Sequence, residues 1–149
     1  MTIMAAVAVW LGVGAAFAQS SVSKIEIVEA WARLVEEGAG FTNAYVELIN
    51  TGDVSDTLLG VTSPWAERSQ IVHYVHDGYD MKLTPVTSLK VRAKNRLKLS
   101  PSGYFIRLET LTKAMRPGVD IPITLRFEKA GIVEVQAKVG NQKLGNLDP

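Results

Sequence analysis

The sequence contains no cysteine, and this absence removes several classes of chemistry at once. Disulfides, thiolate metal sites, iron–sulfur clusters and a cysteine nucleophile all need the missing thiol. Histidine is also scarce, since His73 and His76 are the two in the chain. A site built from three imidazoles of one chain is therefore excluded.

Positive and negative side chains are also nearly equal in number, so the chain has no large net charge. Sixteen Lys and Arg face fifteen Asp and Glu, which leaves a formal net charge of +1. A nucleic-acid-binding domain normally carries a strong positive excess, so we expect no nucleic-acid partner. No nucleophile-elbow pattern frames a serine, no glycine loop suits a phosphate, and no acid–base pair stands out. The sequence thus predicts a protein that is not an enzyme.

The first residues lack charge altogether. Residues 1–18 hold no charged side chain, and the first charge is Lys24. The apolar run 3–17 is shorter than the ~20 residues of a membrane-spanning helix, and Ala16-Phe17-Ala18 fits the small-x-small pattern of signal-peptidase sites. We therefore predict that 1–18 is an export signal, cleaved after Ala18, and that the protein is periplasmic or otherwise exported. Two alternatives remain: an uncleaved anchor, which would be the chain's sole membrane contact, or a buried strand or helix.

The rest of the chain has the pattern of short strands. A chain of 149 residues with 47% hydrophobic and 21% charged composition suits one globular domain, which we place at 19–139. In the clearest run, 121–128, apolar Ile121, Ile123, Leu125 and Phe127 alternate with polar or small partners, which is typical of a sheet covering a core on one side. Further β-branched and aromatic runs occupy 23–31, 41–49, 57–61, 69–75, 81–86, 96–99, 104–108 and 132–139.

Turn residues separate these runs. The segment 50–53 (Asn-Thr-Gly-Asp) predicts a tight turn whose Asn and Gly accept positive φ. Asp77 and Gly78 between two apolar runs predict a β-hairpin. Eight or nine short strands at this spacing indicate an all-β fold, a β-sandwich or Greek-key barrel, without long helices. Residues 140–149 have no periodicity, and we expect a flexible tail there.

One group of side chains could bind a soft metal. His73 and His76 are three apart, so on a regular strand they point to opposite faces and cannot chelate one ion unless the strand breaks. Met81 follows across the predicted Asp77-Gly78 turn, and a His/Met pair suits Cu(I). The alternative is two partly exposed histidines on a hairpin with no ligand.

Many short anchors in one order make the chain resemble a known family. They are 31–33 (Trp-Ala-Arg), 44–45, 50–52, Asp56, Leu58, 63–67 (Ser-Pro-Trp-Ala-Glu), 101–104 (Pro-Ser-Gly-Tyr), Leu108, 116–118 and 125–131. Over 24–139 the sequence resembles the periplasmic copper chaperones written PCu(A)C. The resemblance implies a cupredoxin-like Greek-key β-sandwich. It also implies a protein that carries Cu(I), or in some members Cu(II), toward the CuA site of cytochrome oxidase.

The copper motif of that family is degenerate in this chain. The family pattern is a His, ten residues, a Met, twenty-one residues, then His-x-Met. Aligned without gaps, these positions fall on Val72, Leu83, Phe105 and Arg107, with the spacing intact. Three replacements are apolar, and a guanidinium stays protonated and has no lone pair to donate. If Val72, Leu83 and Phe105 pack together, they leave an apolar patch near Arg107, and such patches often mark contact surfaces.

Two functions follow from this resemblance. The first is a non-metallated binding or accessory protein that contacts a protein partner and needs no cofactor. The alternative is a copper metallochaperone with a relocated site at His73, His76 and Met81, for which copper would be the cargo.

Overall fold

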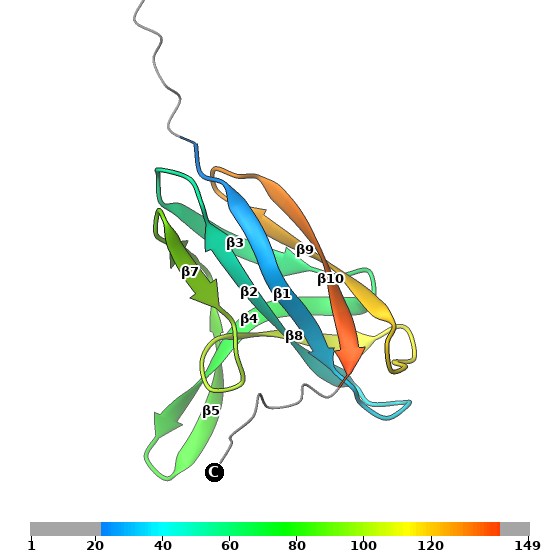
Figure 1. The fold of residues 1–149 in the computed structure, drawn as a ribbon. Coiled ribbons are helices and arrows are strands. Elements are labelled where there is room, and N and C mark those ends of the chain that lie inside the picture. Colours follow the sequence, from blue (N-terminus) through cyan, green and yellow to red (C-terminus); the bar gives the residue numbers. More distant parts are fainter. Residues whose placement is uncertain (1–21, 141–149) are drawn as a thin grey trace, which may run out of the picture.

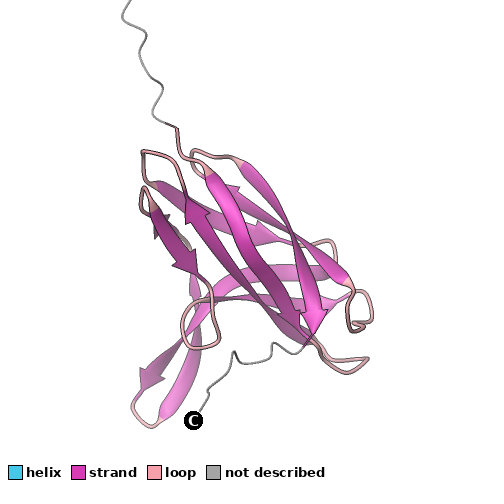
Figure 2. Ribbon diagram, in the orientation of Figure 1, coloured by secondary structure: helices cyan, strands magenta, loops and turns pink. Residues whose placement is uncertain are grey.

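The computed structural model describes residues 22–140, and ten β-strands make up its regular structure. Figure 2 shows no helix among them, so none of the described residues forms an apolar helix of membrane-spanning length. The strands are β1 (Ile25–Arg33), β2 (Phe41–Asn50), β3 (Asp56–Thr62), β4 (Ala66–Asp77), β5 (Asp80–Val86), β6 (Leu89–Val91), β7 (Asn95–Lys98), β8 (Phe105–Leu111), β9 (Asp120–Phe127) and β10 (Ile132–Gly140).

All ten strands belong to one hydrogen-bonded sheet that folds over on itself. Its order is β5-β4-β8-β2-β1-β10-β9-β3-β6, while β7 pairs with the second half of β2. Because β3 also lies against β4, the two ends of this path face each other across a core, and Figure 1 shows β1, β2 and β10 in front of β3, β4 and β8. The all-β, cupredoxin-like fold is confirmed. The three-residue strand β6 is the one that the sequence did not predict.

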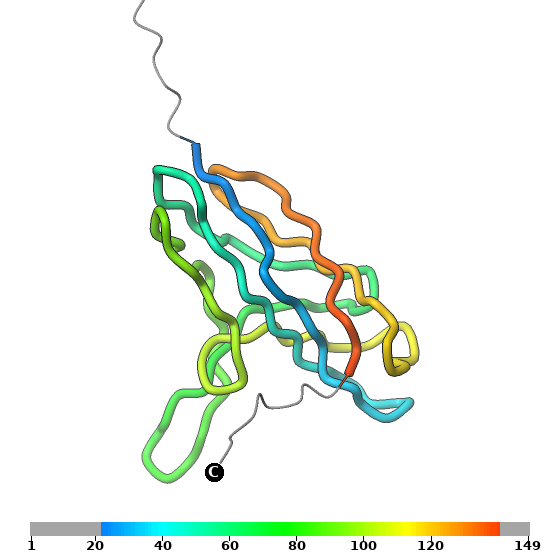
Figure 3. The backbone as a smooth tube through the Cα atoms, viewed as in Figure 1, coloured from blue at the N-terminus to red at the C-terminus, as the bar shows by residue number. Residues whose placement is uncertain are grey.

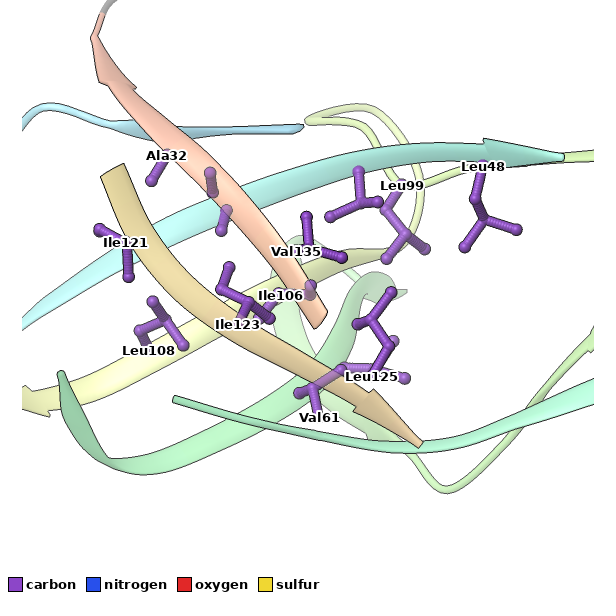
Figure 4. Packing of buried hydrophobic residues seen from close by; sticks show 14 of the residues in the cluster. Ala32, Leu48, Val61, Leu99, Ile106, Leu108, Ile121, Ile123, Leu125 and Val135 are labelled. Carbon is purple, nitrogen blue, oxygen red and sulfur yellow. The ribbon is translucent and has the colours of Figure 1, made fainter. Parts of the chain in front are cut away.

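The main core is built from alternating residues of nearly every strand. In β9 the side chains of Ile121, Ile123 and Leu125 are buried, as their alternation predicted. Figure 4 shows them with Ile106 and Leu108 of β8 between the strands. Each large aliphatic side chain removed from water contributes about 1.5–3 kcal/mol. This one-sided burial leaves the opposite face of β8 free for other contacts.

A long hairpin projects from the sandwich. Strands β4 and β5 pair from Ile71 and Val86 to Asp77 and Asp80, and Gly78 at the turn has φ of 68°. Figure 3 shows this hairpin extending beyond the body, with the β7–β8 connection beside its base. The hairpin predicted at Asp77 and Gly78 is confirmed.

The turn after β2 forms for a reason other than the one predicted. Neither Asn50 nor Gly52 has positive φ. Instead, a Cβ on Gly52 would lie 2.2 Å from the Val22 carbonyl oxygen and 2.6 Å from the Lys24 amide nitrogen. The Asn50 carboxamide ties the turn together by accepting hydrogen bonds from the Gly52 and Lys24 amides. Close approach of the chain before β1, not backbone handedness, therefore requires glycine here.

The predicted ends of the domain lie partly outside the described residues. The signal segment 1–18, its cleavage after Ala18 and nearly all of the tail 140–149 are outside them. Gly140, the first residue of that tail, is the last residue of β10.

Candidate functional site

The four positions aligned with the copper motif lie on the outer face of the sheet, opposite the main core. Val72 of β4 and Phe105 of β8 are register partners, and both are buried. They form a small cluster with Tyr45 of β2, and Trp31 and Leu83 pack against it. We call these five residues the outer cluster. Three of the four aligned positions therefore lie together in one apolar group.

Aromatic contacts dominate the outer cluster. The ring centroids of Trp31 and Tyr45 are 4.3 Å apart, and those of Tyr45 and Phe105 are 6.2 Å apart. Tyr74 of β4, itself 45% exposed, extends the group with its ring centroid 5.5 Å from that of Phe105. Such tilted pairs add about 0.5–1.5 kcal/mol beyond the area they bury. Phe105 is 1% exposed at the centre, so the interior of the cluster is closed to solvent.

Arg107 lies on the same face but turns away from the cluster. Its guanidinium carbon lies 3.4 Å from the centroid of the Phe41 ring. Its Nη1 is 3.5 Å from Asn43 Oδ1, and its Nε is 3.6 Å from Glu109 Oε1. Nε is buried and donates no hydrogen bond within the described residues. The guanidinium thus lies over the face of an aromatic ring.

These side chains do not fit a copper ion. Cu(I) prefers thioether, thiolate and imidazole donors, while the group at the aligned positions offers hydrocarbon and a protonated guanidinium. Within residues 22–140 no three His, Cys, Asp or Glu side chains lie together in a way that could hold a metal. The packed aromatic rings fill the centre instead.

The second candidate group lies further out on the β4–β5 hairpin. Strand β4 runs unbroken through His73 and His76, whose register partners are Thr84 and Met81. Alternation therefore puts the two imidazoles on opposite faces. The His73 ring stacks on Tyr104 with centroids 5.1 Å apart. His76 and Met81 are direct cross-strand neighbours, and all three residues line an open hollow of about 400 Å³.

Sequence reasoning did not identify three aromatic members of this outer face. Tyr45 and Trp31 were anchors of the resemblance without an assigned role, and Tyr74 was not singled out. Strand parity could have found Tyr74, since it is two residues from Val72 on β4, whereas Tyr45 and Trp31 lie on strands that hold no aligned motif position. Burial raises the pKa of the Tyr45 hydroxyl, an effect that the Asn43 side chain and the positive charge of Arg33 partly oppose.

A family match covers most of the described chain. Residues 25–139 match the family described as “LpqE-like: Putative lipoprotein LpqE-like”. A curated relative, “Putative lipoprotein Lxx21020” of Leifsonia xyli subsp. xyli (strain CTCB07), is 28% identical over 116 residues. That match covers 77% of this chain and 69% of the relative.

Solved structures give the same fold. The copper-bound PCuAC domain from PmoF2 superposes with a TM-score of 0.65 at 29% identity, covering 79% of this chain and 93% of that one. The CuI-DR1885 structure from Deinococcus radiodurans gives a TM-score of 0.58 at 27% identity, with 88% and 87% covered. Apo-DR1885, at 24% identity and a TM-score of 0.62 over 98% and 99% of the chains, shows the fold alone.

Fold and comparisons together define a cupredoxin-like β-sandwich of the PCuAC type, related to copper chaperone domains. The chain belongs to the LpqE-like family.

Proposed function

We propose that this protein is a non-metallated binding protein on the PCuAC scaffold and that it contacts a protein partner through its outer face. The observation that carries the proposal is the outer cluster, in which side chains without metal-binding atoms occupy three aligned copper positions. Burial of Val72 and Phe105 supplies stability that a bound metal supplies in many small metal-binding domains. The scaffold thus has no need of copper in order to fold.

Composition at the edge of this cluster supports contact with a protein. Tyr74 and Phe41 are 45% and 44% exposed, and the guanidinium of Arg107 lies on Phe41. Tyrosine, tryptophan, phenylalanine and arginine are the residues enriched at protein interfaces.

An anaerobic Cu(I) titration against a chromogenic chelator tests the metal part of this proposal. The unmodified protein should leave the chelator fully loaded. The combined variant Val72→His, Leu83→Met, Phe105→His and Arg107→Met should gain stoichiometric Cu(I), because positions 105 and 107 share a strand face next to 72. Alanine at the same four positions is the control that removes packing without adding donors. Tight Cu(I) binding by the unmodified protein would contradict the proposal, and its loss in His76→Ala or Met81→Ala would favour the relocated site described below.

We also propose an exported location, for which the uncharged start and Ala16-Phe17-Ala18 are the support. The curated relative carries the printed name of a lipoprotein. The present sequence has no cysteine, so its residues offer no thiol for a thioether-linked lipid.

A second candidate function is copper delivery from a relocated site. The observation favouring it is that His76 and Met81 are register partners and that both line, with His73, one hollow. His76→Ala and Met81→Ala should each weaken Cu(I) binding of the unmodified protein if this site is used. His73→Ala should then have the smaller effect, because His73 faces the other side of β4 and stacks on Tyr104. Absence of Cu(I) binding above that of the double alanine variant would exclude this candidate.

A further inference from the structure

A row of polar side chains crosses four adjacent strands beside the outer cluster. Arg107 of β8 has Asn43 of β2 and Gln70 of β4 as its register partners. Arg33 of β1 follows Ala32, whose partner is Ala44, so the same register sets Arg33 opposite Asn43. We call Arg33, Asn43, Arg107 and Gln70 the polar row. It consists of two guanidiniums and two carboxamides, with no carboxylate in the row.

The positive charge of the polar row is only partly balanced by its neighbours. Glu109 is the nearest carboxylate to Arg107, and it is shared with Arg68, whose Nη1 lies 3.9 Å away. Arg107 Nε is buried and lies 3.6 Å from Glu109 Oε1, too far for a hydrogen bond, so this ion pair is loose. A guanidinium is planar and presents a fork of N–H donors that suits a carboxylate. An anionic group is therefore the complementary ligand.

The surface beside the row is also hollowed. A depression of about 440 Å³ is lined by Arg33, Asn43, Phe41 and the β1–β2 connection, with Glu36 on its loop side. Phe41 is 44% exposed, so the depression offers an apolar wall next to the guanidiniums. A side chain that carries a carboxylate could enter this depression from the solvent side of the sheet and reach the guanidiniums.

The spacing between row and cluster sets a pattern for the ligand. Each row member is two positions from a member of the outer cluster on the same strand, as in the pairs Arg33/Trp31, Asn43/Tyr45, Arg107/Phe105 and Gln70/Val72. Two residues of strand rise roughly 6.5–7 Å, which is also the spacing of residues i and i+2 in an extended peptide.

We infer that this face binds an acidic, extended protein segment in which a carboxylate and an apolar side chain stand two residues apart. The carboxylate contacts the polar row, and the apolar side chain lies on the partly exposed rings of Trp31 and Tyr74. This inference rests on the proposed function, in which the ligand is a protein. It adds that the bound segment of that protein is acidic and has a carboxylate and an apolar side chain two residues apart.

The probe is an end-capped heptapeptide with glutamate and phenylalanine two positions apart, titrated into the ¹⁵N-labelled protein. The expected result is chemical-shift change at the Trp31 indole and the Arg107 side chain. Affinity should fall about tenfold when glutamine replaces the glutamate, since one charge-assisted hydrogen-bond pair is lost. The same loss is expected in 0.5 M salt, at which the Debye length is only about 4 Å.

Arg33→Gln should lower affinity for the glutamate peptide by a similar factor, because Arg33 is exposed and its loss leaves the fold intact. Arg92→Gln, at an exposed arginine after β6, is the matched control and should have no effect. Arg107→Gln, with thermal unfolding to verify folding, is the second variant and should abolish the preference for glutamate over glutamine.

Three results would overturn the inference. They are equal affinity for the glutamate and glutamine peptides, an unchanged affinity in Arg33→Gln and Arg107→Gln, and no shift change up to millimolar peptide. Equal affinity would leave the proposed apolar contact surface standing. Tight Cu(I) binding in the separate titration would instead reject the proposed function without touching the charge preference measured here.

Discussion

At the scale of single residues, the buried Asp56 carboxylate joins three separate parts of the chain. It is 1% exposed and accepts hydrogen bonds from the Ser23 hydroxyl at 2.5 Å and from three backbone amides, those of Thr57, Lys129 and Ala130. Burial alone would raise the pKa of Asp56, but these four hydrogen bonds outweigh it and hold the pKa below its usual value. One carboxylate thus joins the chain before β1, the start of β3 and the β9–β10 turn.

This pKa predicts loss of stability in acid. A lowered folded-state pKa means that the carboxylate stabilises the fold fully above the unfolded pKa of about 3.9, and that this contribution disappears as the pH falls through the folded value. Asp56→Asn should cost about 2–3 kcal/mol at pH 7, with a smaller difference at pH 3. Urea unfolding at both pH values measures this. Asp120→Asn, at an exposed aspartate, is the control. A difference that grows in acid would contradict the assignment.

Asp56 also marks a limit of sequence reasoning. It was visible only as one anchor of a family resemblance, since its partners lie 33 and 73 positions away and leave no local pattern. The contact between Val72 and Phe105 was easier to predict. Both occupy positions of a metal motif whose spacing is intact, and ligands of one metal must lie on neighbouring strands. The stacking of Arg107 on Phe41 was not predictable, since strand parity gives the face of a side chain but not its direction along that face.

At the scale of elements, the strands that alternate strictly were the ones predicted well. The run predicted at 121–128 corresponds to β9, which ends at Phe127, and burial follows its alternation. Strand β6 was missed because three residues are too few to show a period. Strand β4 extends past the predicted 69–75 at both ends, because its start pairs with β8 and its last two residues pair with β5, outside the apolar run that the prediction used.

The turn after β2 gives a prediction at this scale. Gly52→Ala would place a methyl group against the backbone of Val22 and Lys24, so the first strand must shift. We expect a loss of about 2–3 kcal/mol in the free energy of unfolding. Gly40→Ala is the matched control, since nothing lies within 4 Å of a Cβ there, and it should change stability little. Equal effects of the two substitutions in chemical denaturation would show that Val22 and Lys24 do not constrain the turn.

At the scale of the whole molecule, the same strands carry two apolar groups on opposite faces. Ile106 and Leu108 of β8 belong to the main core, while Phe105 between β4 and β2 belongs to the outer cluster. Composition and alternation predicted the sandwich, but they could not show that an outward-facing group is buried as deeply as the core.

The proposed export of the molecule has a direct test. Secreted material should begin at Gln19, because the small-x-small pattern ends at Ala18. Mass spectrometry of the protein from the exported fraction measures the first residue. An intact Met1 in soluble exported protein would contradict the cleavage, and a Met1 form found only with membranes would favour the uncleaved anchor.

The parallel pairing of β1 with β10 has a consequence for how the chain can fold. Trp31, Ala32 and Arg33 find their partners at Lys138, Val139 and Gly140, so the first strand is completed only by the last. A chain that emerges amino end first, from a ribosome or through a membrane pore, cannot close this sheet until residues 138–140 have emerged. Contacts of such long sequence separation also form slowly. The native sandwich is therefore completed only after β10 is free to pair with β1, and until then the amino-terminal strands cannot form the closed sheet.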